Sequence, residues 1–462
     1  MKSAVVEELV VQETAPVPAP ARAAAKRKPP SRRPRRKEPW TEDHVRRLFW
    51  RAGFGARPDE AAAWAKRGRN ATLRWILDGR PGEPMRGQAP IIEGKPLDPY
   101  NEWGHNTLWW LDRMVRSPRP LVEKMTLFWH DHFAVTDQDT PLMMRQNALF
   151  RRRALGSFPK LLRDITVDPA MLMFLSLADS DKESPNENYP RELMELFTLG
   201  KGYSEKDIRQ AARAMTGFKS KWTDDGFQGI SYDAERHDAG VKKIFGKRGR
   251  FTWKDVLELV LAHRSHPPYL VNKLWSFFVT DPPPRATTRH LAAILAHPAL
   301  YQNLGAPDMV KSPVVYVAGS LRTAGLPLTM DSPTWMLESM GQRPFDPPSV
   351  AGWEWGTAWM SSNSMRVRFD WGNQLLREEL VGAKKGQVQP APTPADALEQ
   401  ALNAVGRPWI SNATRSHLLD MAAHFYDDIT PRSLPRRGPE RAEMLQQALR
   451  LVLLAGPDAQ LH

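Results

Sequence analysis

The chain contains no cysteine among its 462 residues. Disulfide bonds, thiolate nucleophiles and cysteine-ligated zinc or iron–sulfur sites are therefore excluded, and a bound divalent metal would need His, Asp, Glu, backbone or water ligands. No apolar run approaches the roughly 18 residues of a membrane-spanning helix. The first residues also lack the apolar stretch of a secretory signal. As written, the sequence predicts a cytoplasmic protein with no transmembrane segment.

Common catalytic signatures are absent as well. The chain has no Gly-x-Ser-x-Gly elbow and no His-Glu-x-x-His helix, so the commonest serine hydrolase and zinc peptidase sites are unsupported. The range 240–248 contains a Gly-Lys pair, but its spacing is one residue too long for a phosphate-binding loop, and Arg248 replaces the required Ser or Thr. No nucleotide motif is present, and no nucleotide cofactor is expected.

Acidic residues are missing from a basic stretch near the N-terminus. Lys, Arg, Pro and Ala fill most of the range from Arg22 to Lys37, and the next acid is Glu38. This stretch carries much of the net charge of +13. Residues 1–39 are therefore expected to form a disordered basic tail. The tail is either a solubilising leader or a contact for nucleic acid through phosphate neutralisation.

The remainder, 40–462, shows mostly helical periodicity, and 41% hydrophobic residues supply a core. We expect an all-α fold in which this range forms a single large multi-helical domain. A Gly-rich insert at 219–252 is irregular and includes a candidate short β-hairpin at Gly226–Tyr232. An aromatic, turn-rich loop region covers 332–371. A linker of Gly, Pro and Ala covers 382–394.

The segment from Phe128 to Phe133 places His130 and His132 in a strongly apolar helical background. Burying imidazoles there is costly unless they meet a partner. Positions i and i+2 of a regular helix point roughly 200° apart, so the two rings cannot share a ligand unless the helix ends nearby, which we expect. Either one histidine has a metal or acid/base role, or both are core residues bonded to backbone carbonyls.

Glu192 and Glu195 lie three residues apart, on one face of a helix predicted over 188–199. Inward carboxylates at such spacing are typical of metal sites in helical bundles. Together with His132, the two glutamates are the candidate catalytic residues. The alternative is a buried ion-pair network in which nearby arginines neutralise the acids, namely Arg191, Arg209 and Arg213.

His237 and Asp238 lie in the Gly-rich insert, ahead of Gly240. A loop histidine beside a carboxylate is a candidate third contributor to a His/carboxylate metal site. The alternative is a surface histidine close to Lys242 and Lys243. The hypothetical metal ligands are therefore His130, His132, Glu192, Glu195, His237 and Asp238.

The aromatic region contains three closely spaced tryptophans, Trp353, Trp355 and Trp359, next to glycines. Aromatic faces near Gly turns can stack on sugars or bases, with Glu354 or Asn363 as polar contacts. The three rings are thus candidate ligand-stacking residues. The alternative is a long loop that its aromatic side chains pin to the helical body.

The chain carries a set of short motifs in a characteristic order: Leu48–Gly55, Phe128–Phe133, Asn186–Leu196, Ala212–Gly217, His237–Asp238, Lys273–Trp275, Val310–Pro313 and Gly341–Pro348. Combined, these motifs resemble an uncharacterised bacterial family, domain of unknown function 1800. The resemblance covers about residues 44–371 and extends toward the helical C-terminal part. The set is specific, although no single motif is.

The resemblance implies a largely helical protein whose relatives are often exported. It also implies a partner protein, because such proteins are often encoded beside a sulfatase-like family. Phe197 departs from the pattern, since many members have a histidine there in a Glu-Leu-His-Thr-Leu-Gly run. If that histidine is a metal ligand in the family, this chain lacks it.

Three hypotheses for function follow. The first is a metal- or acid/base-dependent enzyme acting on an envelope-related or polymeric substrate, with His130 or His132, Glu192 and Glu195 at its polar centre. The second is a non-enzymatic helical scaffold that binds a partner protein or glycan through the aromatic loop. The third is a nucleic-acid contact through the basic tail alone.

Overall fold

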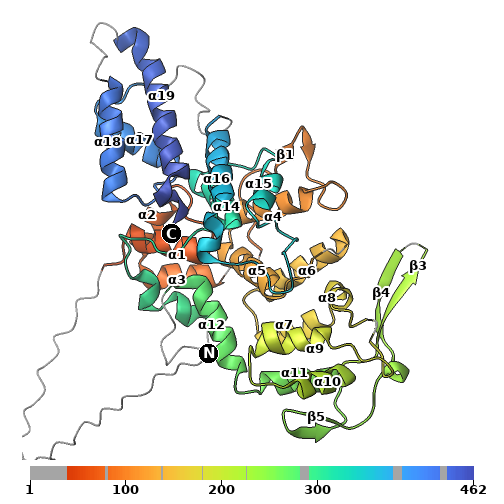
Figure 1. Cartoon of the computed structure of the whole chain (residues 1–462). Helices are drawn as coiled ribbons and strands as arrows, with labels where there is room; N and C mark the ends of the chain where they lie inside the picture. The colour runs from red at the N-terminus through yellow and green to blue at the C-terminus, as the bar shows by residue number, and fades with distance from the viewer. Residues whose placement is uncertain are drawn as a thin grey trace, which may run out of the picture. The chain divides into compact units, whose positions relative to one another are not determined.

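Helices form most of the described chain, which confirms the all-α expectation (Figure 1). The computed structural model describes residues 39–78, 82–136, 139–178, 180–224, 226–280, 291–377, 388–426 and 434–462. The expected basic tail, up to residue 38, and the first part of the expected linker at 382–394 lie outside these residues.

Proline in the first turn starts many of the helices, because its fixed φ suits that position and its missing N–H costs nothing there. Helix α5, for example, begins at Pro120. The first part of the body contains α1 (Glu42–Arg51), α2 (Glu60–Arg67), α3 (Arg69–Asp78), α4 (His105–Arg116), α5 (Pro120–His132), α6 (Thr140–Arg153), α7 (Phe158–Thr166) and α8 (Pro169–Phe174).

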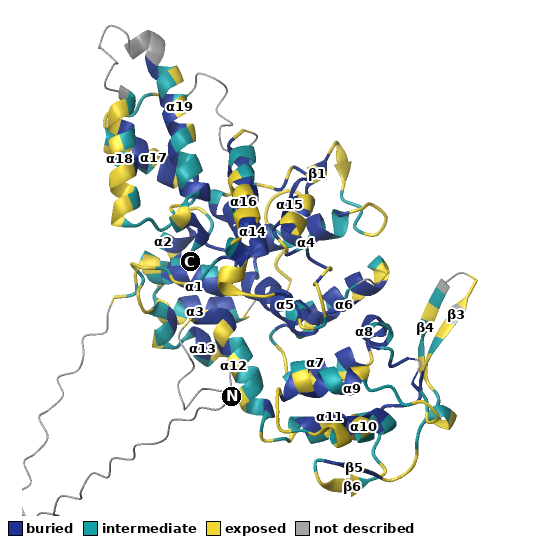
Figure 2. Cartoon of the chain, in the orientation of Figure 1, coloured by how far each residue is buried: buried dark blue, intermediate teal, exposed yellow. Residues whose placement is uncertain are grey.

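Helix α5 lies in the middle of this core. All of its residues except Asp131 are buried, and Figure 2 shows it in the buried colour. An amphipathic helix would leave one polar face exposed, so α5 is a central helix covered on all sides. The exception, Asp131, stands in its last turn.

The helix predicted at 188–199 is present but changes its winding. It begins as α9 (Asn188–Glu192) and continues as a π-helical segment, η1 (Leu193–Thr198). The hydroxyl group of Thr198 donates a hydrogen bond to the carbonyl of Leu193 five residues earlier, across the wider turn. Helix α10 (Glu205–Ala214) follows, with a capping box formed by Ser204 and Asp207.

The Gly-rich insert contains the expected β-structure, but with different boundaries. Strand β3 (Phe218–Thr223) pairs antiparallel with β4 (Gly226–Tyr232), so Gly226–Tyr232 is one strand of a hairpin and does not form a hairpin by itself. Two further pairs are short: β1 (Ile91–Ile92) with β2 (Lys95–Pro96), and β5 (Lys242–Ile244) with β6 (Lys247–Gly249).

The aromatic region at 332–371 is more helical than expected, because α15 (Pro333–Ser339) and most of α16 (Ser362–Leu375) lie within it. Pro333 starts α15, and the Ser361 side chain caps α16. The remaining helices are α11 (Trp253–Leu261), α12 (His266–Phe278), α13 (Leu291–Leu295), α14 (Pro313–Ala324), α15 (Pro333–Ser339), α16 (Ser362–Leu375), α17 (Pro394–Ala404), α18 (Asn412–Tyr426) and α19 (Leu434–Ala455), with short 3₁₀ turns η2 (Ala234–Arg236), η3 (Pro298–Tyr301), η4 (Gly356–Met360) and η6 (Pro457–Gln460).

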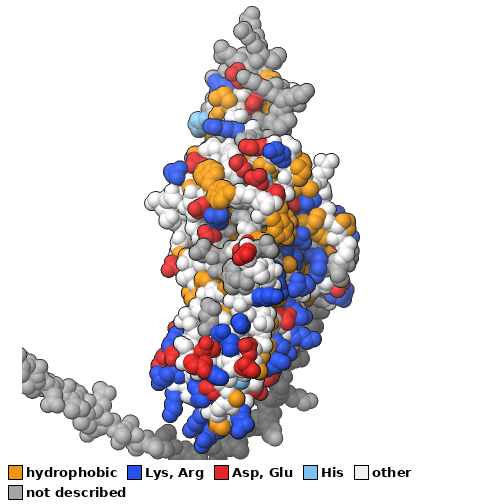
Figure 3. Space-filling model, turned by 90° about the vertical axis from the view of Figure 1, so that its right-hand side faces the viewer, with side chains coloured by type: hydrophobic (Ala, Val, Ile, Leu, Met, Phe, Trp, Pro, Cys, Tyr) orange, Lys and Arg blue, Asp and Glu red, His pale blue; other side chains and the backbone are white. Residues whose placement is uncertain are grey.

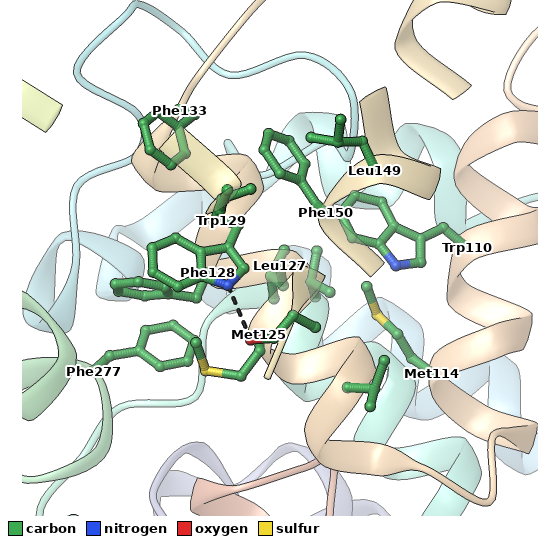
Figure 4. Packing of buried hydrophobic residues seen from close by; sticks show 14 of the residues in the cluster. Trp110, Met114, Met125, Leu127, Phe128, Trp129, Phe133, Leu149, Phe150 and Phe277 are labelled. Atoms are coloured by element: carbon green, nitrogen blue, oxygen red, sulfur yellow. Dashed lines mark hydrogen bonds between the residues drawn. The ribbon is translucent and has the colours of Figure 1, made fainter. Parts of the chain in front are cut away.

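Two hydrophobic clusters hold these helices together. The larger one extends from α1 to α16 and is rich in aromatic rings, such as Trp110, Phe128 and Phe150 (Figure 4). The smaller one joins α17, α18 and α19. Each fully buried large side chain contributes about 1.5–3 kcal/mol to folding. None of the helices formed by the described residues combines the length and apolar character needed to cross a membrane.

Candidate functional site

The last turn of α5 sends its two histidines to different partners, as expected for positions i and i+2. The Nε2 atom of His130 accepts a hydrogen bond from the Phe345 backbone N–H (3.1 Å). Its ring lies among Trp110, Phe345 and Trp353. Burial lowers the pKa of His130 to about 3, so this imidazole stays neutral. His130 is a core histidine that fixes the Phe345 segment.

His132 faces the other way, toward η1 and α12. Its Nε2 atom donates to the carbonyl of Phe197 (3.0 Å), so Nδ1 is the acceptor for the ammonium group of Lys273 (3.4 Å). Burial, and secondly the charge of Lys273, lower the pKa of His132 well below its usual value. Both ring nitrogens are therefore occupied, and the imidazole is neutral.

The end of η1 explains this arrangement. The last carbonyls of a helix have no partner within it and must be satisfied from outside. Here side chains from α5 and α12 donate to three successive carbonyls: Tyr269 and Lys273 to Leu196 O (2.6 and 3.3 Å), His132 to Phe197 O (3.0 Å) and His266 to Thr198 O (3.1 Å). The helix end thereby positions Lys273 and Tyr269. Positive charge is also favourable there because of the helix dipole.

Asp131 lies between the two histidines in sequence and is the one residue of α5 that is not fully buried. Its Oδ1 accepts from the Trp353 backbone N–H (2.8 Å), and its Oδ2 accepts from the Trp355 indole N–H (3.0 Å). Protein atoms surround most of the carboxyl group, and this burial raises its pKa to about 6 against the effect of those hydrogen bonds and of Lys273. Asp131 therefore titrates near neutral pH.

A pocket of about 330 Å³ opens beside Asp131, within the size range of small-ligand sites. Part of its lining is aromatic, formed by Phe128, Phe277 and Trp355. Helix α12 contributes Phe277 and the polar residues Tyr269, Asn272, Lys273 and Ser276, which recur at helical spacing. Asp131 and His132, from the end of α5, add further polar groups.

Lys273 is the cation of this pocket. Within the described residues it forms no direct ion pair with a carboxylate; its bonded partners are Leu196 O and His132 Nδ1. Burial lowers the pKa of Lys273, while the charge of Asp131 acts in the opposite direction. The pocket thus holds an acid and a base that interact through space, and neither neutralises the other by contact.

The two candidate glutamates lie nearer the surface. Glu192 is partly exposed, and burial with repulsion from Glu195 raises its pKa. Glu195 is exposed and hydrogen-bonds with Tyr203, and both act electrostatically on Tyr269 at the pocket. Glu195 therefore acts electrostatically on the pocket residue Tyr269 without lining the pocket itself.

The expected arginine network exists, but it is centred on other acids. Arg191 pairs with Glu187 (3.1 Å) and Glu205 (2.6 Å). Arg213 pairs with Asp238 in the insert (2.6 Å). Glu192 and Glu195 are therefore not neutralised by direct ion pairs with these arginines among the described residues.

His237 and Asp238 serve the insert and not the pocket. His237 Nδ1 donates to the carbonyl of Thr216 (3.0 Å). Asp238 binds the Arg213 guanidinium through both oxygens and also accepts from the Gly240 N–H. These contacts hold the loop between β4 and β5 against α10.

The predicted metal constellation is not assembled by this geometry. Within the ranges that the structure describes, no group of three or more His, Asp or Glu side chains could hold a metal ion. His130 is enclosed by aromatic rings, and His132 uses both nitrogens in other bonds. The ammonium group of Lys273 would also repel a cation at His132. The Phe197 ring packs against Phe133 and His132 in the core, and its carbonyl accepts the hydrogen bond from His132.

The three tryptophans of the aromatic region have different surroundings. Trp353 and Trp359 are both 5% exposed, whereas Trp355 is 40% exposed and lines the pocket. The Trp355 ring packs edge-on against Phe277. The loop is thus pinned to the body as the alternative interpretation expected, and Trp355 alone among the three is placed to contact a ligand in the pocket.

Sequence reasoning missed Asp131, Lys273 and Tyr269 as site residues. Asp131 was visible between the two histidines, and Tyr269 and Lys273 share a helix face at i, i+4. The sequence gives no sign that α12 lies against the end of α5. Lys273 and His132, which are in contact there, are 141 positions apart in the chain.

Comparison with known proteins identifies one family. The model of the family described as "Protein of unknown function (DUF1800)" matches residues 47–461. The match continues past residue 371 through the C-terminal helices. No curated protein and no solved structure gave a significant match.

Proposed function

Since the chain belongs to the DUF1800 family, whose function is unknown, we propose a function from its own geometry: an acid/base enzyme with its active site in the Asp131–Lys273 pocket. The observation that carries the proposal is that a carboxyl group and an ammonium group share one pocket with aromatic residues in its lining, and that neither forms a direct ion pair among the described residues. Groups whose pKa values are shifted toward neutrality cluster at catalytic sites.

In this proposal Asp131 is the general base and Lys273 stabilises developing negative charge or donates a proton. The raised pKa of Asp131, about 6, leaves it ionised at pH 7 yet basic enough to accept a proton. His132 is a positioning residue, because it holds the Lys273 ammonium group at its Nδ1 atom. Glu192 and Glu195 do not line the pocket, and in this proposal they act only electrostatically, Glu192 and Glu195 on Tyr203 and Glu195 on Tyr269.

The substrate class follows from the walls. Trp355 and Phe277 offer ring faces and edges to an apolar or sugar-ring surface, while Asn272 and Ser276 add exposed polar groups. This combination suits a polar polymer such as an envelope glycan. No metal enters the proposed reaction, since both His132 nitrogens are engaged and Lys273 is nearby.

A first test needs no substrate. Lys273 should react with acetic anhydride at lower pH than Lys95, an exposed lysine on β2, in pH-dependent competitive labelling of the full chain followed by mass spectrometry. The pKa of Asp131, measured by NMR, should lie near 6. Ordinary values for both groups would remove the basis of the proposal.

A second test screens the protein against soluble glycan polymers and chromogenic glycosides and esters. Asp131→Asn should lower the rate roughly 100-fold or more and remove the acidic limb of the pH profile. Lys273→Met should act as strongly. Asp370→Asn, at a surface carboxylate paired with Arg366, is the matched control. Full activity in both pocket variants would contradict the proposal.

A second candidate is binding without chemistry, and the exposed ring of Trp355 favours it. In this case the pocket would hold a glycan or a side chain of a partner protein, and a sulfatase-like protein is the partner to try first. Trp355→Ala should then weaken binding, whereas Asp131→Asn should leave it within about threefold, because Asn retains an acceptor for the Trp353 N–H. Loss of turnover in Asp131→Asn with binding unchanged would favour the enzyme.

A further inference from the structure

A second pocket, of about 530 Å³, shares no lining residue with the Asp131–Lys273 pocket. Its walls are the segment 86–91, the C-terminal end of α4 and the segment 325–329 after α14. Ala89, Pro90, Leu326 and Pro327 give it an apolar surface. Its charged lining is entirely basic, made of Arg57, Arg86, Arg116 and Arg322.

The helix end of α4 explains why two of these arginines lie together. Arg322 Nη1 donates to the carbonyls of Val115 (2.9 Å) and Ser117 (3.1 Å). Arg57 Nη2 donates to the same Val115 carbonyl (2.8 Å). Unpaired carbonyls at a helix C-terminus attract cations, so both guanidinium groups converge there.

The acids nearby do not balance this charge. Arg116 is neutralised by Asp112 through two bonds (2.6 and 2.7 Å). The other three arginines share one carboxylate, Glu60, whose nearest approaches to Arg322 and Arg86 are 3.8 and 3.9 Å, too long for hydrogen bonds. Among the described residues, Arg57 Nη1 and Arg322 Nη2 have no acceptor, and Glu60 Oε1 in the same cluster has no hydrogen-bond donor. Three guanidinium groups beside one carboxylate leave the cluster with an excess of positive charge.

The electrostatics agree with that excess. Burial, followed by repulsion from Arg322, lowers the pKa of Arg57 to about 9, and burial lowers the pKa of Arg322 to about 10. Protein groups that supply enough negative charge would oppose such shifts. The pocket wall is also held in place, because Arg86 N–H donates to Arg116 O (3.0 Å) and Arg116 Nη1 donates to Gly87 O (3.1 Å).

We propose that this pocket binds a small organic anion. Its carboxylate or phosphate group contacts Arg57 and Arg86, with the buried charge of Arg322 behind them, and its apolar part lies on the Pro90 and Leu326 surface. Guanidinium groups match the oxygens of both anions, which is why carboxylate and phosphate share this site chemistry. Binding would supply the counter-charge that Glu60 alone does not.

Titration calorimetry on the full chain at low salt tests the proposal with four probes: hexanoate, acetate, inorganic phosphate and hexan-1-ol. Hexanoate should bind roughly tenfold more tightly than acetate because its chain is buried on the apolar wall. Hexan-1-ol, with the same chain and no charge, should bind more weakly than hexanoate. If phosphate binds more tightly than hexanoate, the ligand carries a phosphate group. If hexanoate binds more tightly, the ligand carries a carboxylate. Both results support an anion site.

Variants then locate the site. Arg57→Met should weaken hexanoate and phosphate binding roughly tenfold, and Arg57→Lys less, because it keeps the charge. Arg86→Ser, which changes an exposed side chain, should also weaken hexanoate and phosphate binding. If Arg57→Met does not fold, the affinity of Arg86→Ser tests whether the anion binds in this pocket. Arg74→Met, exposed on α3 and not part of the pocket, is the control. Absence of anion binding, equal binding of hexanol and hexanoate, or wild-type affinity in Arg86→Ser and the folded Arg57 variants would overturn the proposal.

Discussion

Two carboxylates stand about two turns apart on helix α5 and have opposite properties. Glu123 is 1% exposed and binds Arg151 through both oxygens (2.8 and 2.9 Å), with further contacts from Arg113 and Trp110. Burial alone would raise its pKa, but the arginines outweigh burial and lower it. Asp131 has two neutral N–H donors and no direct ion pair with Lys273, and burial raises its pKa to about 6.

The difference shows that burial does not decide what an acid does on this helix; its partners do. Glu123 is fully satisfied by cations and acts as a structural link between α4, α5 and α6. Asp131 is left titratable near neutral pH at the edge of a pocket. The same contrast separates His130, bonded inside the aromatic core, from His132, bonded to the pocket lysine. On the face drawn in Figure 3, basic and acidic side chains lie interspersed.

The largest expected effect is on the structural acid. Glu123→Gln removes the charge that Arg151 and Arg113 face, and it should lower the free energy of unfolding by about 3 kcal/mol, at the lower end for broken buried pairs because both arginines retain some solvent contact. Asp131→Asn should cost less than about 1 kcal/mol at pH 7. Urea unfolding of both variants measures these free energies. Equal losses of stability in the two variants would contradict the different roles of Glu123 and Asp131.

The next effect concerns the backbone next to Asp131. Gly352 has φ +82°, and a Cβ there would collide with the Asp131 carboxyl group and its backbone carbonyl. Gly352→Ala should therefore cost about 2–3 kcal/mol, from left-handed strain plus displacement of Asp131. Gly356→Ala, with φ +70° and open space around it, should cost only about 1 kcal/mol. Thermal unfolding of Gly352→Ala and Gly356→Ala separates the cost of left-handed backbone strain, which both variants share, from the cost of the collision with Asp131, which only Gly352→Ala has.

The pH dependence of stability should have opposite sign for the two acids. The pKa of Asp131 is raised in the folded protein, so its contribution to stability is complete below about pH 4 and is lost as the pH rises through 6. This contribution is about 2 kcal/mol, because solvent on the pocket side of the carboxyl group weakens the effect. Glu123, with a lowered pKa, contributes above its unfolded value and loses this as the pH falls. Unfolding of wild type, Asp131→Asn and Glu123→Gln between pH 3 and 7 measures both slopes.

The smallest effect is expected at the rim. Trp355→Phe removes the hydrogen bond to Asp131 Oδ2 but keeps an aromatic ring against Phe277. It should change stability by about 1 kcal/mol or less and raise the Asp131 pKa further, because one stabilising donor is lost. NMR titration of Asp131 in the variant provides the measurement. An unchanged pKa would mean that the Trp353 N–H and Lys273 alone control the carboxyl group.

Local sequence signals predicted much of the fold. Helical periodicity gave the all-α class, and the helix end near Phe133 was anticipated from the polar and β-branched residues after it. The frequent Gly, Pro and Trp residues at 332–371 predict a loop, whereas Pro333 starts α15 and the Ser361 side chain caps α16. In this region, helix capping and packing against the body determined the secondary structure, and local composition did not.

The candidate site was predicted only in part. The sequence singled out the His-Asp-His segment and the Glu192–Glu195 segment, and both end near one pocket. It left the polar centre open between a metal or acid/base site and core histidines with ion-paired glutamates, because it could not show that the end of η1 offers backbone carbonyls to His132 and Lys273. Those bonds join α5, η1 and α12 across 65 to 141 positions.

The sequence by itself determined that the protein is helical, that its chemistry cannot use cysteine, and that His130 and His132 point in different directions as long as the helix is regular. Only the tertiary structure decided that Asp131 meets indole and amide donors, that Lys273 lies beside it, and that three arginines share Glu60. The physical reason is the same in each case. Periodicity and spacing act within one helix, whereas a pKa, a bonded tautomer or a charge excess depends on atoms that folding brings from other helices.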